Sequence, residues 1–226
     1  MIHPGSAARL TEGLARAQSL WQSAKGQAGQ ALTIALNREA GTQGTTVAQA
    51  VGARLGWPVY DHELLEHIAR EKGLRLSLLE SLDEKPQSWF LECIQAFVGE
   101  SLGESGFVSH LVETIVSLGR LGRCIIVGRG AVHLLPRETT LRVRLVAPLN
   151  DRIAAYAQHF GVAREEAARQ VETQDRQRAS FVQNHFHKDV ADPHNYDLIL
   201  NTARWSVEEC ADAIVEAVNR LQRRPH

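Results

Sequence analysis

The chain of 226 residues has little cysteine, almost no net charge and no long uninterrupted apolar run. Its three cysteines, Cys93, Cys124 and Cys210, lie far apart and form no CxxC pair, which argues against a disulfide framework and favours a reducing compartment. No apolar run approaches the roughly 20 residues that a membrane-spanning helix needs, and the N-terminal segment lacks the apolar core of a signal peptide. We therefore expect a soluble, cytoplasmic protein without a membrane partner.

Positive and negative side chains nearly balance, with a formal net charge of -1 and a pI near 6.8. No basic field is available to attract nucleic acid, so we expect no nucleic-acid partner. Hydrophobic residues make up 44% of the chain and charged residues 23%. That composition and length suit one globular domain that carries an inserted subdomain.

Short apolar segments alternate with segments of helical periodicity, which is typical of an α/β fold with a parallel sheet. Buried strands are predicted at 31–36, 57–61, 124–128, 141–147 and 196–202. Helices are predicted at 6–25, 45–56, 61–73, 77–84, 88–102, 107–119, 150–161, 163–186 and 206–222. Ser206, with Glu209 three residues on, predicts a capping box at the start of the last helix.

This order of elements predicts how the chain is organised. Residues 1–30 form an N-terminal helical extension, and residues 31–222 form the main domain. Because only helices are predicted between Asp61 and Arg123, we interpret 61–123 as an inserted helical region that binds the acceptor or serves as a lid.

The segment LNREAGTQGTT at 36–46 lies between the first strand and its helix and lacks a lysine. At such a turn, converging backbone N–H groups and the helix dipole favour phosphate. Gly41 and Gly44 allow the bends, and the hydroxyls of Thr45 and Thr46 stand where Mg²⁺ on a nucleotide is bound. By itself, the segment fits either a phosphate loop or an ordinary turn between a strand and a helix.

Charged residues near the ends of other strands favour the phosphate loop. The first strand leads to Arg38, the second to Asp61, and the third to Arg129 between two glycines. A later helix carries Asp175, Arg176 and Arg178 in the stretch DRQRAS. Carboxyl ends of parallel strands meet at one edge of a sheet. Arginines gathered there could clamp a polyphosphate with forked hydrogen bonds.

These motifs together resemble the cytidylate kinase-like branch of the nucleoside monophosphate kinases. The resemblance runs from about Leu32 to Val218 and is loose across 72–120. It rests on these stretches, in order: REAGTQG at 38–44, LGWPVYD at 55–61, IIVGRGA at 125–131, RLVAPLNDRI at 144–153, DRQRA at 175–179 and DPHNYDLILNT at 192–202.

The resemblance implies a P-loop NTPase-type three-layer α/β sandwich with a five-stranded parallel sheet. It also implies ATP with Mg²⁺ as phosphoryl donor and a nucleoside monophosphate, CMP or dCMP, as acceptor. The donor phosphates and Mg²⁺ would lie on Gly41, Thr42, Gln43, Gly44, Thr45 and Thr46. Arg38, Arg129, Asp175 and Arg178 would be catalytic, the last three also binding the acceptor with Asp61. Arg176 would belong to a lid over 176–192 that closes on ATP.

The sequence departs from the ordinary cytidylate kinases in its cations. Their loop lysine falls on Gly44 or Thr45, depending on the register, and one acceptor-binding arginine falls on Glu66. An upstream arginine of their lid helix falls near Val171. Two alternatives to a CMP kinase therefore stay open. One is a weak or inactive nucleotide-binding module that senses a nucleotide or docks a partner, and the other is a kinase with a changed acceptor.

Histidines gather in the stretch NHFHKDVADPH, at His185, His187 and His194. They could bind a divalent metal, but His-x-His on a helix diverges, and we interpret the stretch as a solvated lid loop. Lys188 in the same stretch could supply a missing cation.

Overall fold

The computed structural model describes residues 31–80, 82 and 105–223. The helices predicted at 6–25 and 88–102 lie outside them, as does Cys93. The five strands form one parallel sheet in the order β2-β3-β1-β4-β5. Val59 of β2 pairs with Ile125 of β3, and Val143 of β4 pairs with Leu198 of β5. The predicted α/β fold with a five-stranded parallel sheet is confirmed.

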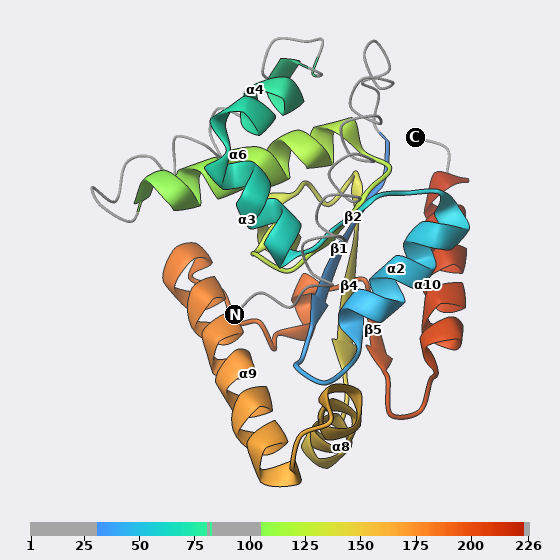
Figure 1. The fold of residues 1–226 in the computed structure, drawn as a ribbon. Helices are drawn as coiled ribbons and strands as arrows, with labels where there is room; N and C mark the ends of the chain where they lie inside the picture. The colour runs from blue at the N-terminus through green and yellow to red at the C-terminus, as the bar shows by residue number, and fades with distance from the viewer. Residues whose placement is uncertain (1–30, 81, 83–104, 224–226) are drawn as a thin grey trace. The chain divides into compact units, whose positions relative to one another are not determined.

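The chain divides into two compact units, of which one comprises 34–57, 127–133 and the chain from 141 onward. Its strands are β1 (Thr33–Arg38), β4 (Thr140–Val146) and β5 (Leu198–Asn201). Its helices are α2 (Gly44–Leu55), α7 (Ala131–Leu134), α8 (Leu149–Phe160), α9 (Arg164–Phe186), the 3₁₀ turn η1 (Pro193–Asn195) and α10 (Val207–Gln222). Within this unit α2 packs on α10, and α8 packs on α9 (Figure 1).

The other unit comprises the described residues of 31–33, 58–126 and 134–140. It contains β2 (Val59–Tyr60), β3 (Ile125–Val127), α3 (His62–Arg70), α4 (Lys72–Glu80) and α6 (Ser105–Leu121). The three helices pack against one another. The buried side chains of Leu65, Ile68 and Ile115 form part of this packing.

Local sequence signals place the elements that hold the site. All six residues of β1 are buried, as an apolar strand covered on both faces should be. Helix α2 ends where Gly56 adopts a left-handed backbone with φ 69°, the expected C-terminal cap. The predicted capping box of α10 is confirmed, because Ser206 and Glu209 satisfy each other's backbone N–H groups.

The boundary between the two helices after Asp61 was wrongly predicted. The helix predicted at 77–84 begins instead at Lys72 and ends at Glu80, as α4. The apolar spacing after Asp61 predicts a helix that ends at Gly73, but α3 ends at Arg70 and Gly73 lies inside α4. Glycine weakens a helix by only about 1 kcal/mol, and the packing of Leu78 in the core of this unit outweighs that cost.

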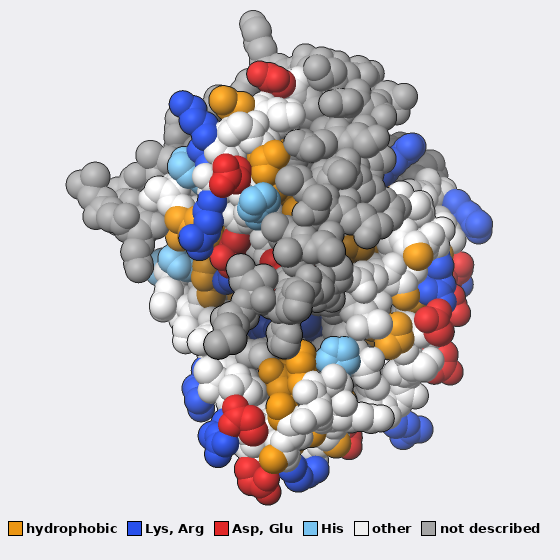
Figure 2. Space-filling view, in the orientation of Figure 1, with side chains coloured by type: hydrophobic (Ala, Val, Ile, Leu, Met, Phe, Trp, Pro, Cys, Tyr) orange, Lys and Arg blue, Asp and Glu red, His pale blue; other side chains and the backbone are white. Residues whose placement is uncertain are grey.

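No helix among the described residues has both the length and the apolarity to cross a bilayer. On the face shown in Figure 2, acidic and basic side chains are interspersed over the described residues. This mixture agrees with the small net charge of the chain.

Candidate functional site

The segment after β1 forms a tight loop that ends at the N-terminus of α2. Gly41 has φ 84° and Gln43 has φ 54°, both in the left-handed region. Gln43 is the N-cap and makes no side-chain capping bond. The first N–H groups of a helix have no partner within the helix, and those of Gly44, Thr45 and Thr46 occupy this position in α2, where an anion is favoured.

Backbone atoms of the loop, at Ala40 and Gly41, hold it against Arg152 of α8. A Cβ on Gly41 would be closer to the carbonyl oxygen of Arg152 than any real Cβ contact, so only glycine fits there. Arg152 donates from Nη1 to the carbonyl of Ala40 at 3.1 Å. Thr42 is buried, and its hydroxyl donates to the carbonyl of Glu39 at 2.8 Å. The hydroxyl of Thr42 thus closes the loop internally.

Arg38, at the end of β1, runs between two glycines. It is 8% exposed. A Cβ on Gly44 would lie 2.6 Å from Cγ of Arg38, and a Cβ on Gly128 would overlap its Nη1. The stem of Arg38 therefore covers the first residue of α2, and its guanidinium group lies over the turn that follows β3. A lysine at position 44 would have no room beside this arginine.

Two further buried arginines surround Glu39. Arg144 of β4 donates from Nη2 to Glu39 at 3.4 Å, and Arg152 of α8 approaches the same carboxylate at 3.3 Å. Tyr196 is 9% exposed. It accepts from Asn37 at 3.1 Å and donates to the carbonyl of Val190 at 2.8 Å. This network fixes both ends of the loop's first turn to β4, α8 and the segment after α9.

Helix α9 contacts the loop through two neighbouring turns. Asp175 accepts from the backbone N–H of Ala40 at 2.7 Å and from Arg152 at 2.5 Å. Arg178 donates to the carbonyl of Arg38 at 3.3 Å. Burial is the main cause that lowers the pKa of Arg178, the charge of Asp175 raises it, and the charge of Arg129 lowers it.

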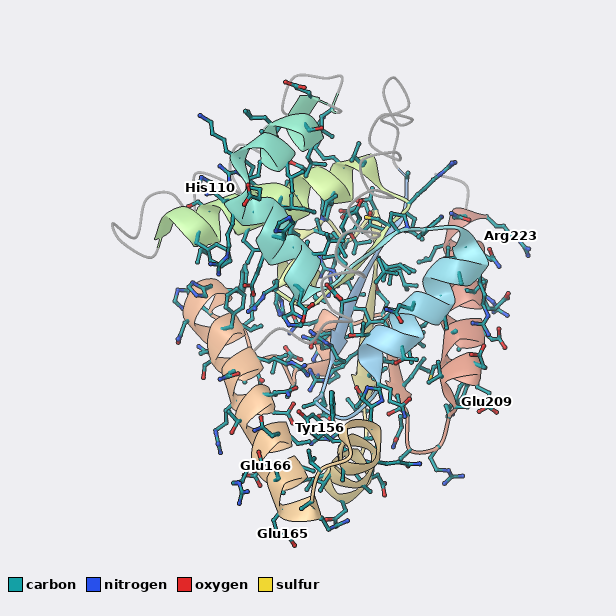
Figure 3. All side chains as sticks on the ribbon, viewed as in Figure 1. His110, Tyr156, Glu165, Glu166, Glu209 and Arg223 are labelled. Carbon is teal, nitrogen blue, oxygen red and sulfur yellow. The ribbon has the colours of Figure 1, made fainter. Side chains whose placement is uncertain are left out.

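Tyr156 and Gln174 connect α8 to α9 beside this contact. Gln174 donates to the hydroxyl of Tyr156 at 3.2 Å and accepts from Arg178 at 3.3 Å. Tyr156, which is labelled in Figure 3, also packs against a small core cluster that includes Ala40 and Ile153. The amide of Gln174 therefore orients Arg178 toward the loop.

Arg129 lies in a turn of three consecutive left-handed residues, with φ 83° at Gly128, 50° at Arg129 and 77° at Gly130. A left-handed backbone is costly for a residue with a side chain, and such strain clusters at functional sites. The guanidinium carbon of Arg129 lies 5.3 Å from the ring centroid of Phe181, over its face.

Five arginines and two carboxylates make up this connected site. They are Arg38, Arg129, Arg144, Arg152 and Arg178, with Glu39 and Asp175. Within this set, which lies beside the N-terminus of α2, the guanidinium groups outnumber the carboxylates. An arrangement of this kind suits an anion with several oxygens, because guanidinium groups bind such anions with paired hydrogen bonds.

The structure thus brings together the predicted Arg38, Arg129, Asp175 and Arg178 with the loop from Gly41 to Thr46. Thr45 is partly buried and Thr46 is exposed, both in the first turn of α2. Arg176 instead projects outward from α9, with a side chain 72% exposed and 3.8 Å from Glu172. Asp61 belongs to the other compact unit, where it caps α3 by accepting from the N–H of Leu64 at 3.1 Å.

The histidine-rich segment was interpreted as a solvated lid loop. The ring of His185 lies 4.7 Å from that of Phe181 in a tilted arrangement, His187 caps the end of α9, and His194 lies 2.8 Å from Asp192. Among the described residues, no group of three or more metal-ligating side chains is placed to hold a metal. Lys188 is exposed, and its role as a substitute cation stays a prediction.

Several site residues were not identified from the sequence: Arg144, Arg152, Tyr196, Phe181 and His133. Arg152 belongs to the stretch RLVAPLNDRI, and an arginine after a strand that ends in Ala-Pro was the one available signal. The ring of His133 lies near that of Phe186, with ring centroids 6.0 Å apart. The Nε2 atom of His133 is buried without a hydrogen-bond partner among the described residues.

Protonation of His133 should make the fold acid-sensitive. Burial, followed by the charges of Arg142 and Lys188, lowers its pKa from 6.5 to about 4. The unfolded chain therefore binds a proton between those two pH values while the folded chain does not, and stability falls as pH falls through that window. After a discount for the partly exposed ring, we expect a loss of about 1–2 kcal/mol between pH 7 and 4.5 that His133→Gln removes.

Urea unfolding at the two pH values measures this loss. His159→Gln, which changes an exposed histidine of α8, is the matched control and should keep the wild-type pH dependence. If His133→Gln loses as much stability as the wild type on acidification, His133 is not the group responsible.

The fold is an α/β domain built on a five-stranded parallel sheet. The chain belongs to the cytidylate kinase-like family, whose model matches residues 33–204. This match confirms the resemblance seen in the motifs, and the family supports a nucleotide kinase activity.

Individual relatives agree with this assignment. The cytidylate kinase of Methanopyrus kandleri is 26% identical over 185 residues, which cover 81% of this chain and 91% of that protein. The cytidylate kinase of Methanothrix thermoacetophila is 25% identical over 194 residues, which cover 84% of this chain and 100% of that protein. The crystal structure of an uncharacterized protein from Eubacterium ventriosum shares the fold, with a TM-score of 0.67, 18% identity, and coverage of 84% of this chain and 98% of that one.

Proposed function

We propose that this protein transfers the γ-phosphoryl group of ATP to a nucleoside monophosphate, with CMP or dCMP as acceptor. A phosphate oxygen of the acceptor would attack the γ-phosphorus of ATP. The bond between the γ-phosphorus and the oxygen bridging it to the β-phosphate would break, which yields ADP and a second nucleoside diphosphate. Such a reaction needs little covalent chemistry from the protein and depends on positioning and charge stabilisation.

The observation that carries this proposal is the excess of guanidinium groups around the N-terminus of α2. The donor phosphates would lie on the N–H groups of Gly44, Thr45 and Thr46, with Arg38 beside them. Arg129 and Arg178 would bind the acceptor phosphate or the group in transfer. A polyphosphate has the oxygens to accept paired hydrogen bonds from several of these guanidinium groups.

The residues present also fit Mg²⁺ bound through the nucleotide. Mg²⁺ prefers hard oxygen ligands and is usually held by substrate phosphates with one or two protein groups. The hydroxyls of Thr45 and Thr46 stand in the first turn of α2, whereas that of Thr42 is committed to Glu39. We therefore assign Thr45 or Thr46 as the protein ligand. When bound there, the ion would neutralise charge on the β- and γ-phosphates.

The test is a coupled assay of ADP release with ATP, Mg²⁺ and a panel of nucleoside monophosphates. We expect turnover with CMP or dCMP and a much lower rate when the acceptor is omitted. Turnover with another monophosphate alone would keep the kinase and replace the acceptor. If no acceptor supports turnover and calorimetry shows no heat for ATP, the proposal is wrong.

A second candidate function is nucleotide sensing without transfer. It is favoured by Asp175, because each of its two carboxylate oxygens already has a partner, the N–H of Ala40 and the guanidinium group of Arg152. It is also favoured by the absence of a lysine from the loop. Calorimetric binding of ATP and of CMP, together with no ADP release above background, would identify this function.

A further inference from the structure

The side chain of Asn37 connects the backbone of Arg38 to Tyr196. Its Oδ1 atom accepts from the backbone N–H of Arg38 at 2.6 Å, and its Nδ2 atom donates to the hydroxyl of Tyr196 at 3.1 Å. Asn37 is 8% exposed and Tyr196 is 9% exposed, so water competes little for these bonds. The amide of Asn37 therefore joins the end of β1 to the segment that follows α9.

The hydroxyl of Tyr196 determines which way this amide is oriented. It donates its single proton to the carbonyl of Val190 at 2.8 Å. Toward Asn37 it can therefore only accept, which requires the NH₂ group of Asn37 on that side and its oxygen on the side of Arg38. Arg144 supports the arrangement, because its Nη1 atom donates to the same hydroxyl at 3.3 Å and also to the carbonyl of Val190.

The bonds to the backbone of Arg38 affect where its charge lies. Both polar backbone groups of Arg38 are held by side chains, because its N–H donates to Asn37 and its carbonyl accepts from Arg178 at 3.3 Å. The guanidinium group is at the far end of a long side chain, so a small rotation of the backbone displaces it more than it displaces Cα. The stem of Arg38 is also confined beside Gly44, which leaves little room to correct such a rotation.

We propose that Tyr196 is a positioning residue for phosphoryl transfer, whose hydroxyl orients Asn37 and thereby holds Arg38 where it can contact the donor phosphates. This inference rests on the proposed function for the identity of the ligand. The hydrogen bonds themselves exist without a ligand. Arg38 has further contacts that the hydroxyl does not influence, so we expect its removal to reduce transfer without abolishing it.

The test removes the hydroxyl and keeps the ring. Tyr196→Phe leaves the NH₂ group of Asn37 without this acceptor. We expect kcat/KM for ATP to fall about five- to fifty-fold, because a small misplacement of a catalytic group has a large effect on rate. KM for the acceptor should change little. Thr33→Val is the matched control and should keep the wild-type kcat/KM. It removes a buried hydroxyl at the start of β1 that donates to the carbonyl of Gly119 at 3.3 Å.

Double variants show whether Tyr196 acts through Asn37 and Arg38. In the Asn37→Leu and Arg38→Ala backgrounds, Tyr196→Phe should cause no further loss of kcat/KM, because a member of the chain that it acts through is absent. An effect of the hydroxyl that bypasses Arg38 would give the same fold-loss in every background. That result, or a wild-type kcat/KM in Tyr196→Phe, overturns the proposal.

A second readout follows the hydrogen bonds without activity. The NMR signals of the Asn37 side-chain NH₂ and of the Arg38 backbone N–H should both shift in Tyr196→Phe and not in Thr33→Val. An unshifted Arg38 N–H in Tyr196→Phe overturns this proposal alone. If the wild type transfers nothing, the proposed function fails, and the affinity for ATP by calorimetry replaces kcat/KM in the same series. Absence of both transfer and ATP binding overturns the two proposals together.

Discussion

Replacing Arg38 by alanine should lower the rate of phosphoryl transfer by a factor on the order of 10²–10³. It should also remove the thermal protection that a bound nucleotide gives the protein. The reason is that the loop has no lysine and its first cation is supplied by the end of β1. The guanidinium group of Arg38 lies between α2 and the turn after β3 and is 8% exposed, so its charge acts in a poorly solvated site.

Three variants separate this role from simple packing. Arg38→Lys keeps the charge but lacks the fork of donors, and we expect an intermediate rate. Gly128→Ala keeps Arg38 but puts a methyl group where its Nη1 lies, at a backbone φ of 83°. We expect this variant to reproduce much of the loss of transfer rate. Arg220→Ala removes an exposed arginine of α10 and is the control. If Arg38→Ala keeps full protection by nucleotide in a thermal shift assay, the loop binds phosphate without this residue.

Asp175→Asn should lower both the free energy of unfolding and the rate of transfer. The carboxylate is the shared partner of the Ala40 N–H and of Arg152, whose side chain is 10% exposed. The side-chain oxygen of an asparagine can still accept from Ala40. Its NH₂ group, a hydrogen-bond donor, then faces the guanidinium group of Arg152, which is also a donor. Arg152 then keeps Glu39 as a carboxylate partner, so its buried charge is only partly compensated. We expect a loss of about 2 kcal/mol, because Asp175 itself is partly exposed.

Urea unfolding and the ADP-release assay measure the two effects. Asp212→Asn is the matched control, because it removes an ion pair with Arg54 at 3.1 Å whose carboxylate is 70% exposed. That change should cost about 0.5 kcal/mol or less. If Asp175→Asn unfolds like the wild type yet loses transfer, the carboxylate acts on the substrate and not as a tie between α9 and the loop.

The elements that frame the site were predicted well because their signals are local. The strand at 31–36 and the helix at 45–56 correspond to β1 and α2, and the loop between them was identified from its glycines. Gly41 does adopt a left-handed backbone. Periodicity and turn residues act over a few positions, so a single sequence suffices to detect them.

The contacts within the site were not predictable in the same way. Asp175 was expected beside an acceptor, and the sequence gives no sign that it also accepts from Ala40, 135 positions away. Likewise nothing local shows that Arg38 fills the space above Gly44. Such contacts depend on how distant elements pack. The motifs therefore identified the residues that gather at the site, and the structure identified their partners.

The packing of Arg38 against Gly44 also determines whether this long side chain becomes ordered on folding or on ligand binding. A lysine on the first turn of a helix is free to move until phosphate arrives, and its immobilisation costs about 0.5–1.5 kcal/mol on binding. The stem of Arg38 is already fixed between two glycines. The side chain of Arg38 therefore loses its conformational entropy when the protein folds. A nucleotide would then bind to a charge that is preorganised.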